Sequence, residues 1–292
     1  MTDASALPRF GVVVLTMGRR PADLDRGLRS LLAQQGVRTD IVVVGNGWEP
    51  TGLPDGVRAH ALDENIGIPA GRNAGVPLVD GDLLFFLDDD ASLPDPSFLR
   101  SVADRFAVDP TLGLIQPRVV DPAGLTAPRR WVPRLRVGNP YASSSATALW
   151  EGAVAMRRSL FDAIGGWPDE FFYAHEGIDV VWRVWDEGYM PWYAADLVVH
   201  HPVIDPARHD VYYRLNARNR VWLARRNLPV VLEPVYVGTW VGMTLLRVHD
   251  REALGAWFGG LREGMTRRPA GRRAMKWRTV WAMTRAGRPP VI

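Results

Sequence analysis

The chain of 292 residues contains no cysteine. This excludes disulfides, zinc sites built on thiolates and cysteine nucleophiles, and it fits a reducing compartment. Long apolar runs are lacking as well. The longest candidate, residues 235–246, is interrupted by Gly238 and Gly242 and falls short of the roughly 20 residues that a spanning helix needs. Residues 1–8 lack the basic-then-apolar order of a signal peptide, so the sequence predicts a cytoplasmic protein.

The composition is that of a globular protein with a sizeable core, because 47% of the residues are hydrophobic and 23% are charged. The length predicts one large domain, or one domain with an appendage. The net charge of +3 is modest but unevenly distributed, since the last 31 residues hold a single acid, Glu263. The basic residues of this tail are Arg262, Arg267, Arg268, Arg272, Arg273, Lys276, Arg278, Arg285 and Arg288. Such a tail suits anionic partners, or it is a solvated helix face.

The most informative stretch is the apolar run 83–87, which three consecutive aspartates follow, Asp88, Asp89 and Asp90. Its length and aromatic content predict a buried strand. Adjacent carboxylates repel one another, and Mg²⁺ or Mn²⁺ is the commonest compensation because these ions take oxygen ligands. The carboxyl end of a strand is also where open α/β sheets bind ligands. The alternative is a solvated acidic turn that precedes the helix beginning near Pro94.

The order of apolar patterns predicts an α/β fold with a mostly parallel, Rossmann-like sheet flanked by helices over residues 1–228. Predicted strands occupy residues 10–16, 41–44, 57–61, 83–87, 112–116, 149–156 and 193–201. A helix over residues 210–227 follows the last strand, and two helical stretches, 235–261 and 270–286, complete a helical extension over 229–292. Tryptophan and arginine interleave in this basic extension, a pattern typical of a membrane interface or of a subunit contact.

Residues 121–145 form a long irregular segment that contains four prolines and a basic-aromatic patch. A loop of this length inside a compact domain is usually functional or mobile. It is interpreted as a lid or an acceptor-facing loop, with disorder without function as the alternative.

The conjunction of motifs over residues 10–228 resembles that of an inverting family 2 glycosyltransferase with the GT-A fold. The motifs are, in chain order, a Thr-x-x-Arg loop (Thr16 and Arg19), a turn at Asn46, Glu-Asn-x-Gly and Gly-Arg-Asn-x-Gly over residues 64–75, Leu-Asp-Asp-Asp over 87–90, Gly-Gly-Trp-x-Asp-Glu over 165–170, Glu-x-x-Asp-x-x-x-Arg over 176–183, and a histidine at the end of the last strand. Their combination is far more specific than any one of them.

The resemblance implies a donor site and a metal site. Residues expected to bind the nucleotide part of a nucleotide-sugar are Thr16, Arg19, Asn46, Asn65, Arg72, Asn73, Asp88 and Asp89. Residues expected to hold Mg²⁺ or Mn²⁺ are Asp88 and Asp90, the outer carboxylates of an Asp-x-Asp motif, together with His200. The implied donor is a UDP-, dTDP- or GDP-sugar.

The resemblance also implies a catalytic base, which in the family is a carboxylate of a Glu-Asp pair at a helix start. This chain departs from the pattern, because glycine follows glutamate in Glu176-Gly177. Glu176 is the first candidate for the base and Asp179 is the second. A further departure is Gly45, where the family often has an aspartate that reads the base, so the resemblance does not specify uridine.

The function implied is metal-assisted transfer of a hexosyl or deoxyhexosyl group with inversion, onto a cell-envelope glycan or a lipid-linked saccharide. The basic extension motivates a membrane-proximal acceptor and a peripheral position on the inner face of the membrane, and a homo-oligomer contact is its alternative. Nucleic-acid binding is not expected, because no recognition module accompanies the basic tail. Two other functions compete. Gly45 and Gly177 allow a degenerate nucleotide-sugar-binding protein, whereas a nucleotidyltransferase is disfavoured because no glycine-rich phosphate loop with lysine follows the first strand.

Overall fold

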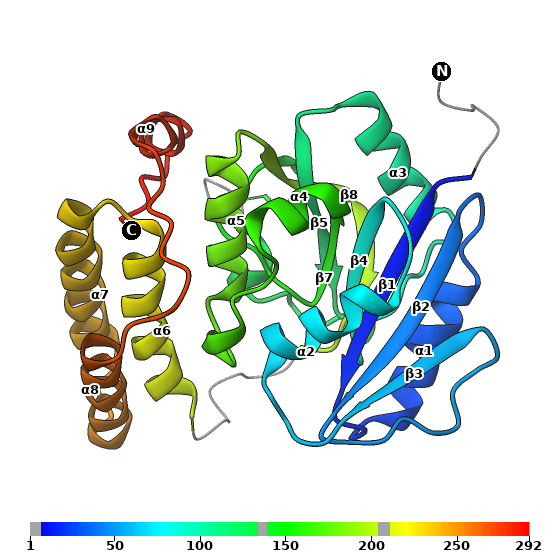
Figure 1. Ribbon diagram of the computed structural model, residues 1–292, viewed down its shortest axis with the longest axis horizontal. Helices are drawn as coiled ribbons and strands as arrows, with labels where there is room; N and C mark the ends of the chain where they lie inside the picture. The colour runs from blue at the N-terminus through cyan, green and yellow to red at the C-terminus, as the bar shows by residue number, and fades with distance from the viewer. Residues whose placement is uncertain (1–6, 134–138, 204–210, 292) are drawn as a thin grey trace.

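The computed structural model describes residues 7–133, 139–203 and 211–291, and an eight-stranded sheet forms its centre (Figure 1). The strand order is β3-β2-β1-β4-β7-β5-β8-β6. The strands are β1 (Arg9–Thr16), β2 (Arg38–Asn46), β3 (Val57–Leu62), β4 (Leu83–Asp88), β5 (Leu112–Val120), β6 (Ser144–Ser145), β7 (Ala153–Arg157) and β8 (Met190–His200).

Strands β1 to β4 run parallel to one another, as do β5 and β8, whereas β7 lies antiparallel between β4 and β5. The short β6 is antiparallel to β8 at the edge. The register brings three strand ends together, because Leu15 of β1 pairs with Asp88 of β4 and Thr16 pairs with Gly45 of β2. The polar residues at these carboxyl ends therefore share one edge of the sheet.

Helices cover both faces of the sheet, and two clusters of buried side chains separate them from it. Helices α1 and α3 cover one face, and α2, α4 and α5 cover the other (Figure 1). The β-branched and aromatic composition of β1, β2 and β4 suits strands that are buried on both faces. The helices are α1 (Pro21–Leu32), α2 (Ile68–Gly75), α3 (Phe98–Val108), α4 (Arg158–Ile164), α5 (Glu176–Asp186), α6 (Tyr212–Asn227), α7 (Glu233–Arg247), α8 (Arg251–Thr266) and α9 (Trp277–Arg285).

Helices α6, α7, α8 and α9 form a further layer outside α5, which we call the C-terminal layer (Figure 1). The helix predicted over residues 235–261 is two helices, since α7 ends at Arg247 and the side chain of Asp250 accepts a hydrogen bond from the amide of Ala253 to begin α8. The helix predicted over 270–286 is helical only in α9. Residues 270–276 instead run along the end of α6, where the amides of Arg273 and Met275 donate to backbone carbonyls of α6.

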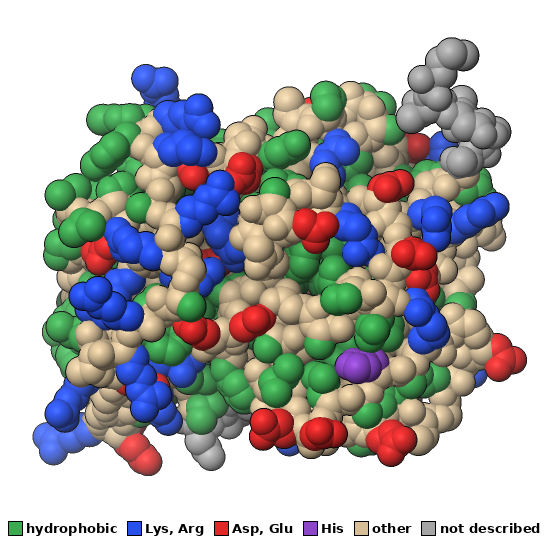
Figure 2. Space-filling model, in the orientation of Figure 1, with side chains coloured by type: hydrophobic (Ala, Val, Ile, Leu, Met, Phe, Trp, Pro, Cys, Tyr) green, Lys and Arg blue, Asp and Glu red, His purple; other side chains and the backbone are tan. Residues whose placement is uncertain are grey.

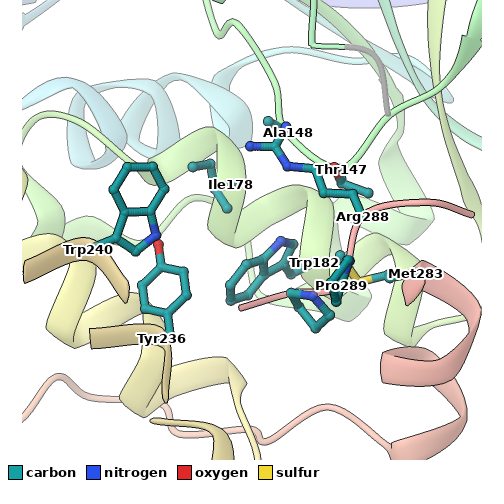
Figure 3. Close-up of a pocket in the computed structure, with 10 residues that line it drawn as sticks. Thr147, Ala148, Ile178, Trp182, Tyr236, Trp240, Met283, Arg288 and Pro289 are labelled. Carbon is teal, nitrogen blue, oxygen red and sulfur yellow. The ribbon is translucent and has the colours of Figure 1, made fainter. Parts of the chain in front are cut away.

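This layer shares its apolar core with α5. Trp182 of α5 packs edge-on against Tyr236 of α7, with 5.8 Å between ring centroids. Figure 3 shows these rings together with Trp240 and Met283 around a cavity of about 20 Å³. That volume holds about one water molecule, so the cavity is a packing gap rather than a substrate site. Among the described helices, none has the length and apolar character needed to cross a membrane.

The crossing of α6 and α8 depends on a glycine. A Cβ atom at Gly260 would lie 2.0 Å from the backbone oxygen of Arg214 in α6, whereas a Cβ atom at the neighbouring Gly259 would meet no atom within 4 Å. Gly260 thus lets the two helices approach closely, and Gly259 does not.

We predict that Gly260→Ala destabilises the protein by about 1–3 kcal/mol, because the added methyl group forces α6 and α8 apart. Gly259→Ala is the matched control, and it should stabilise α8 by about 0.5–1 kcal/mol because alanine is the better helix former. Urea unfolding of both variants measures the difference. Equal unfolding free energies would show that the close approach does not matter.

Candidate active site

Three strand ends place polar side chains at one edge of the sheet. Thr16 at the end of β1 is buried, and its hydroxyl donates to Oδ2 of Asp89 at 2.6 Å. The same hydroxyl oxygen accepts the amide of Gly18 at 3.0 Å, which closes the loop after β1. Asp88 ends β4, and its amide donates to the carbonyl of Gly152 just before β7. The aspartates therefore lie where the sequence predicted them, at the carboxyl end of a buried strand.

Each of the three carboxylates has a cationic neighbour. Arg72 of α2 donates to Oδ1 of Asp88 at 2.7 Å, and its guanidinium is only 2% exposed. Arg20, in the loop after β1, pairs with Asp90 and lies 3.7 Å from Oδ1 of Asp89. These positive charges offset the mutual repulsion of the aspartates.

The environment sets the ionisation of this cluster. Burial opposes ionisation of Asp90, but the hydrogen bond from His201 and the charges of His201 and Arg20 outweigh it, so the pKa of Asp90 lies below its usual range. Burial also opposes the charge on His201, but Asp90 outweighs it and raises the pKa of His201. For Asp89, burial prevails over the hydrogen bond from Thr16 and raises the pKa to about 6. Asp90 and His201 thus favour each other's charged forms, beside a weakly acidic Asp89.

The histidine of the cluster is His201 and not the predicted His200. Nε2 of His201 lies 3.0 Å from Oδ1 of Asp90. His200 is the last residue of β8, where its backbone exchanges two hydrogen bonds of 2.9 Å with Ser92. Side chains alternate along a strand, so the two adjacent histidines point to opposite sides.

The residues present fit a divalent cation. One ligand atom from each of Asp88, Asp90 and His201 lies within 4.8 Å of the other two. Two carboxylates and one imidazole are donors that Mn²⁺ accepts readily, and Mg²⁺ accepts the carboxylates. Asp88 retains an exposed side-chain fraction of 34%, whereas that of Asp90 is 4%. Asp88 is therefore the ligand most open to a bound diphosphate.

A second polar group lies beyond β2. The amide group of Asn46, which is buried, donates to Oδ1 of Asn65 at 2.8 Å and accepts from the backbone of Ile66 at 2.9 Å. Oδ1 of Asn65 also accepts the amide of Gly67. The two predicted nucleoside contacts are thus joined in one network. The expected aspartate at position 45 has no room here, because a Cβ atom at Gly45 would lie 1.8 Å from the backbone oxygen of Trp48.

Three other residues predicted to bind the nucleotide-sugar, Arg19, Arg72 and Asn73, lie in three different environments. Arg19 is exposed, whereas its neighbour Arg20 reaches the aspartates. Arg72 pairs with Asp88 and stacks on Trp167, with its guanidinium 5.0 Å from the ring centroid. Asn73 joins α2 to the turn before α5, because its amide group donates to the carbonyl of Trp167 at 2.9 Å and accepts the amide of the same residue at 3.0 Å.

Aromatic rings line the cluster on the side of the predicted lid. Trp131, from the irregular segment 121–145, is buried and contacts both Trp150 and His201 with centroid distances of 5.7 and 5.3 Å. The ring of Trp150 lies 4.9 Å from His201. Part of the predicted loop is therefore fixed against the metal candidates, while its residues 134–138 lie outside the described residues.

The two predicted bases occupy different environments. Asp179 is fully buried and pairs with Arg183 and with Arg226 at 3.1 Å, and it accepts from Asn227 at 2.6 Å. These contacts tie α5 to α6 and leave Asp179 no access to a substrate. Glu176, the first residue of α5, is 3% exposed, and its Oε2 has no partner among the described residues.

A carboxylate that the sequence analysis missed accompanies Glu176. The amide of Gly177 donates to Oε1 of Glu151 at 2.8 Å. Burial, and then the charge of Glu151, raise the pKa of Glu176 to about 8. Burial also raises the pKa of Glu151. Glu151, Arg20 and His201 were not expected here. The only sequence signals were an arginine next to Arg19, a histidine next to His200 and a glutamate inside the strand predicted over residues 149–156.

The segment that leads into α5 is strained and is held from α6. Phe172, Ala174 and His175 all have positive φ angles, between 62° and 72°, which non-glycine residues rarely adopt. Asn219 of α6 is fully buried and donates to the carbonyls of Phe171, Tyr173 and Ala174 at 2.7–2.9 Å. This side chain supplies the hydrogen bonds that compensate for the strain, so α6 fixes the position of Glu176.

The profile of the family described as "Glycosyl transferase family 2" matches residues 12–165, more than half of the chain. The chain belongs to this family. A search among curated proteins gave no match. Solved structures with a similar fold include GalNAc-T7 in a crystal structure with UDP, GalNAc and Mn²⁺ (TM-score 0.66, 14% identity, 99% of this chain and 59% of that one).

Two further similar structures are S. aureus TarS (TM-score 0.60, 15% identity, 88% of this chain and 49% of that one) and a mannosyltransferase from Pyrobaculum calidifontis, PcManGT, in complex with GDP-Man and Mn²⁺ (TM-score 0.57, 18% identity, 98% of this chain and 87% of that one). The chain thus spans about three fifths of GalNAc-T7 and about half of TarS. At these identities the likeness concerns the fold, and it confirms the predicted GT-A architecture with a helical C-terminal region.

We predict that His201→Ala weakens Mn²⁺ binding by about tenfold or more, because an imidazole ligand is lost. His200→Ala is the matched control and should leave the affinity unchanged, since His200 is not a member of the group that could hold the ion. Titration calorimetry with Mn²⁺ in the presence of UDP or GDP measures both, after thermal unfolding has shown that both variants fold. An equal loss in the two variants would contradict the assignment of His201.

Proposed function

We propose that this chain transfers a sugar from a nucleoside-diphosphate sugar to an acceptor hydroxyl, with inversion and with the help of Mg²⁺ or Mn²⁺. The observation that carries the proposal is the group Asp88, Asp90 and His201 at the carboxyl edge of the sheet, in a chain that belongs to glycosyltransferase family 2. The complexes of GalNAc-T7 with UDP and Mn²⁺ and of PcManGT with GDP-Man and Mn²⁺ are consistent with it. The donor is accordingly taken to be a UDP-, GDP- or dTDP-sugar.

The nucleotide would lie along the strand ends. Asn46 is buried and holds Asn65, whose exposed side chain would contact the base and ribose near the end of β1. The guanidinium of Arg20 lies beside Asp90 and Asp89. A diphosphate bound next to Asp88 would be close enough for Arg20 to contact it. Arginine suits this place because its planar, permanently charged group binds phosphate oxygens in pairs.

The reaction breaks the bond between the anomeric carbon of the sugar and the diphosphate oxygen, which keeps the electron pair. The acceptor hydroxyl attacks the same carbon from the opposite face, and its proton goes to a carboxylate of the enzyme. When bound, the cation supplies Lewis-acid stabilisation of the charge on the leaving diphosphate. We assign the base to one of the two carboxyl groups that meet at the start of α5, those of Glu176 and Glu151, because Asp179 is enclosed by its partners in α6.

Gly45 and Gly177 suggested the alternative of a degenerate binding protein without catalytic activity, but their surroundings give that alternative little support. Gly45 is imposed by the turn at Trp48, and the carboxyl group of Glu151 lies beside Gly177. Catalysis therefore remains the better proposal than binding alone.

We predict that UDP, GDP or dTDP raises the melting temperature only together with Mn²⁺, by about 5 °C at a hundredfold excess over the dissociation constant. Asp90→Ala should abolish the shift because it removes a ligand, whereas Asp55→Ala, an exposed aspartate far along the chain, should keep it. Release of the diphosphate from UDP-GlcNAc or GDP-Man then tests catalysis. A protein that neither shifts nor cleaves in this panel would refute the proposed function.

We extend the proposal to the acceptor, which we infer to be a cell-envelope glycan or a lipid-linked saccharide at the cytoplasmic face of a membrane. Helix α9 buries Val280 and Met283 while its opposite face exposes Trp277 and Trp281, four residues apart. Arginines flank these rings at positions 278 and 285, both exposed. Lys and Arg side chains also gather over the C-terminal layer in Figure 2. Exposed tryptophan beside arginine is typical of helices that lie on anionic lipid surfaces.

We predict that the protein sediments with vesicles that contain phosphatidylglycerol and not with vesicles of phosphatidylcholine alone. Trp277→Ala/Trp281→Ala should reduce this binding, because the rings that enter the lipid interface are removed, and both positions are exposed so that the fold should persist. If light scattering instead detects a dimer that the double variant dissociates, α9 is a subunit contact and the membrane assignment is wrong.

A further inference from the structure

The space beside Gly177 is already filled by a carboxylate. A Cβ atom at Gly177 would lie 2.3 Å from Oε1 of Glu151 and 2.7 Å from both Cγ and Cδ of the same side chain. No side chain at position 177 can therefore coexist with the present position of Glu151. The carboxyl group of a residue 26 positions earlier thus occupies the space into which a side chain at the second position of the Glu-Asp pair would extend.

The backbone on both sides of Glu151 is fixed to the proposed donor site. Trp150 packs edge-on against His201. The carbonyl of Gly152 accepts the amide of Asp88 at 2.8 Å, and a Cβ atom at Gly152 would lie 2.6 Å from Oδ2 of that aspartate. Glu151 thus spans the short distance between the end of β4 and the start of α5, where a hydroxyl attacking a donor held at Asp88 would pass.

The hydrogen bonds of the two glutamates differ. Glu151 accepts the amide of Gly177 in the first turn of α5, and an amide at a helix N-terminus stabilises an anion. Glu176 is 3% exposed, and its Oε2 has no partner among the described residues, which disfavours a charge there. Glu151 is also the more exposed of the two. The charge of Glu151 opposes ionisation of Glu176, and in such a pair one carboxyl group holds the proton while the other is ionised. These contacts make Glu151 the ionised and accessible member.

We propose that Glu151 is the catalytic base of the transfer reaction and replaces, from the loop before β7, the carboxylate that Gly177 lacks. This assignment rests on the proposed function. In the step, the acceptor oxygen bonds to the anomeric carbon, the bond from that carbon to the diphosphate breaks with its electrons on the leaving group, and the acceptor proton passes to the carboxylate of Glu151. Glu176 keeps its proton, and the amide of Gly177 holds Glu151 in place.

The test compares Glu151→Gln with wild type, with water as the acceptor and release of the nucleoside diphosphate from UDP-GlcNAc or GDP-Man as the readout. The amide oxygen of glutamine can still accept the hydrogen bond from Gly177, so the fold should persist. We expect kcat to fall about a hundredfold or more, as is usual for loss of a general base. The thermal shift with nucleotide and Mn²⁺ should stay as in wild type. Glu252→Gln, in the exposed first turn of α8, is the control and should keep wild-type kcat.

A second pair of variants moves the carboxylate. Glu151→Ala/Gly177→Asp places an aspartate in the space that the glutamate vacates, and it should recover at least tenfold in kcat over Glu151→Ala/Gly177→Ala, which has no carboxylate there. Full activity of Glu151→Gln, or loss of activity in Glu176→Gln alone, would overturn the assignment of Glu151 while the proposed function stands. A wild-type protein that binds nucleotide with Mn²⁺ but cleaves no donor, or that binds none, would overturn both.

Discussion

The mutual repulsion of three adjacent carboxylates at the end of β4 is the constraint on which the rest of the site depends. Burying such a group without counter-charges costs several kcal/mol per ion. The chain brings positive charge to it from three separate elements: Arg20 from the loop after β1, Arg72 from α2 and His201 from the end of β8. The arrangement depends on a sheet in which β1, β4 and β8 end at a common edge. The strand topology therefore makes the charge compensation possible.

The elements were largely predictable from the sequence, because apolar runs and helical spacing are local signals. The strands β1 to β4, the aspartates at the end of β4 and the start of α5 near Glu176 agree with the expectations. At the site, the differences from expectation concern which of two adjacent residues faces the aspartates. His201 rather than His200, and Arg20 rather than Arg19, face the aspartates. At the end of β8 a shift of one residue reverses the side to which a side chain points, and in the bend after Gly18 the backbone decides which arginine turns inward.

The sequence also could not specify which residues far apart in the chain contact each other. Nothing in the spacing of residues relates Glu151 to Gly177, or Asn219 to the positive-φ segment before α5. Asp179 illustrates the reverse case, because its place one turn into α5 made it a plausible base, and only the packing of α6 shows that it holds two helices together. The C-terminal layer therefore contributes to the site indirectly, since α6 positions the helix start that carries Glu176.

The close contact between Glu151 and Gly177 also limits how such a site can change by mutation. A side chain gained at position 177 meets the carboxyl group of Glu151 at 2.3 Å, whereas loss of the glutamate alone leaves the helix start without its acceptor. Each single substitution thus passes through a chain in which the carboxyl group of Glu151 is either displaced or absent. The two arrangements of the carboxylate are separated by an unfavourable intermediate, and a lineage that holds one of them is expected to keep both positions together or to exchange both.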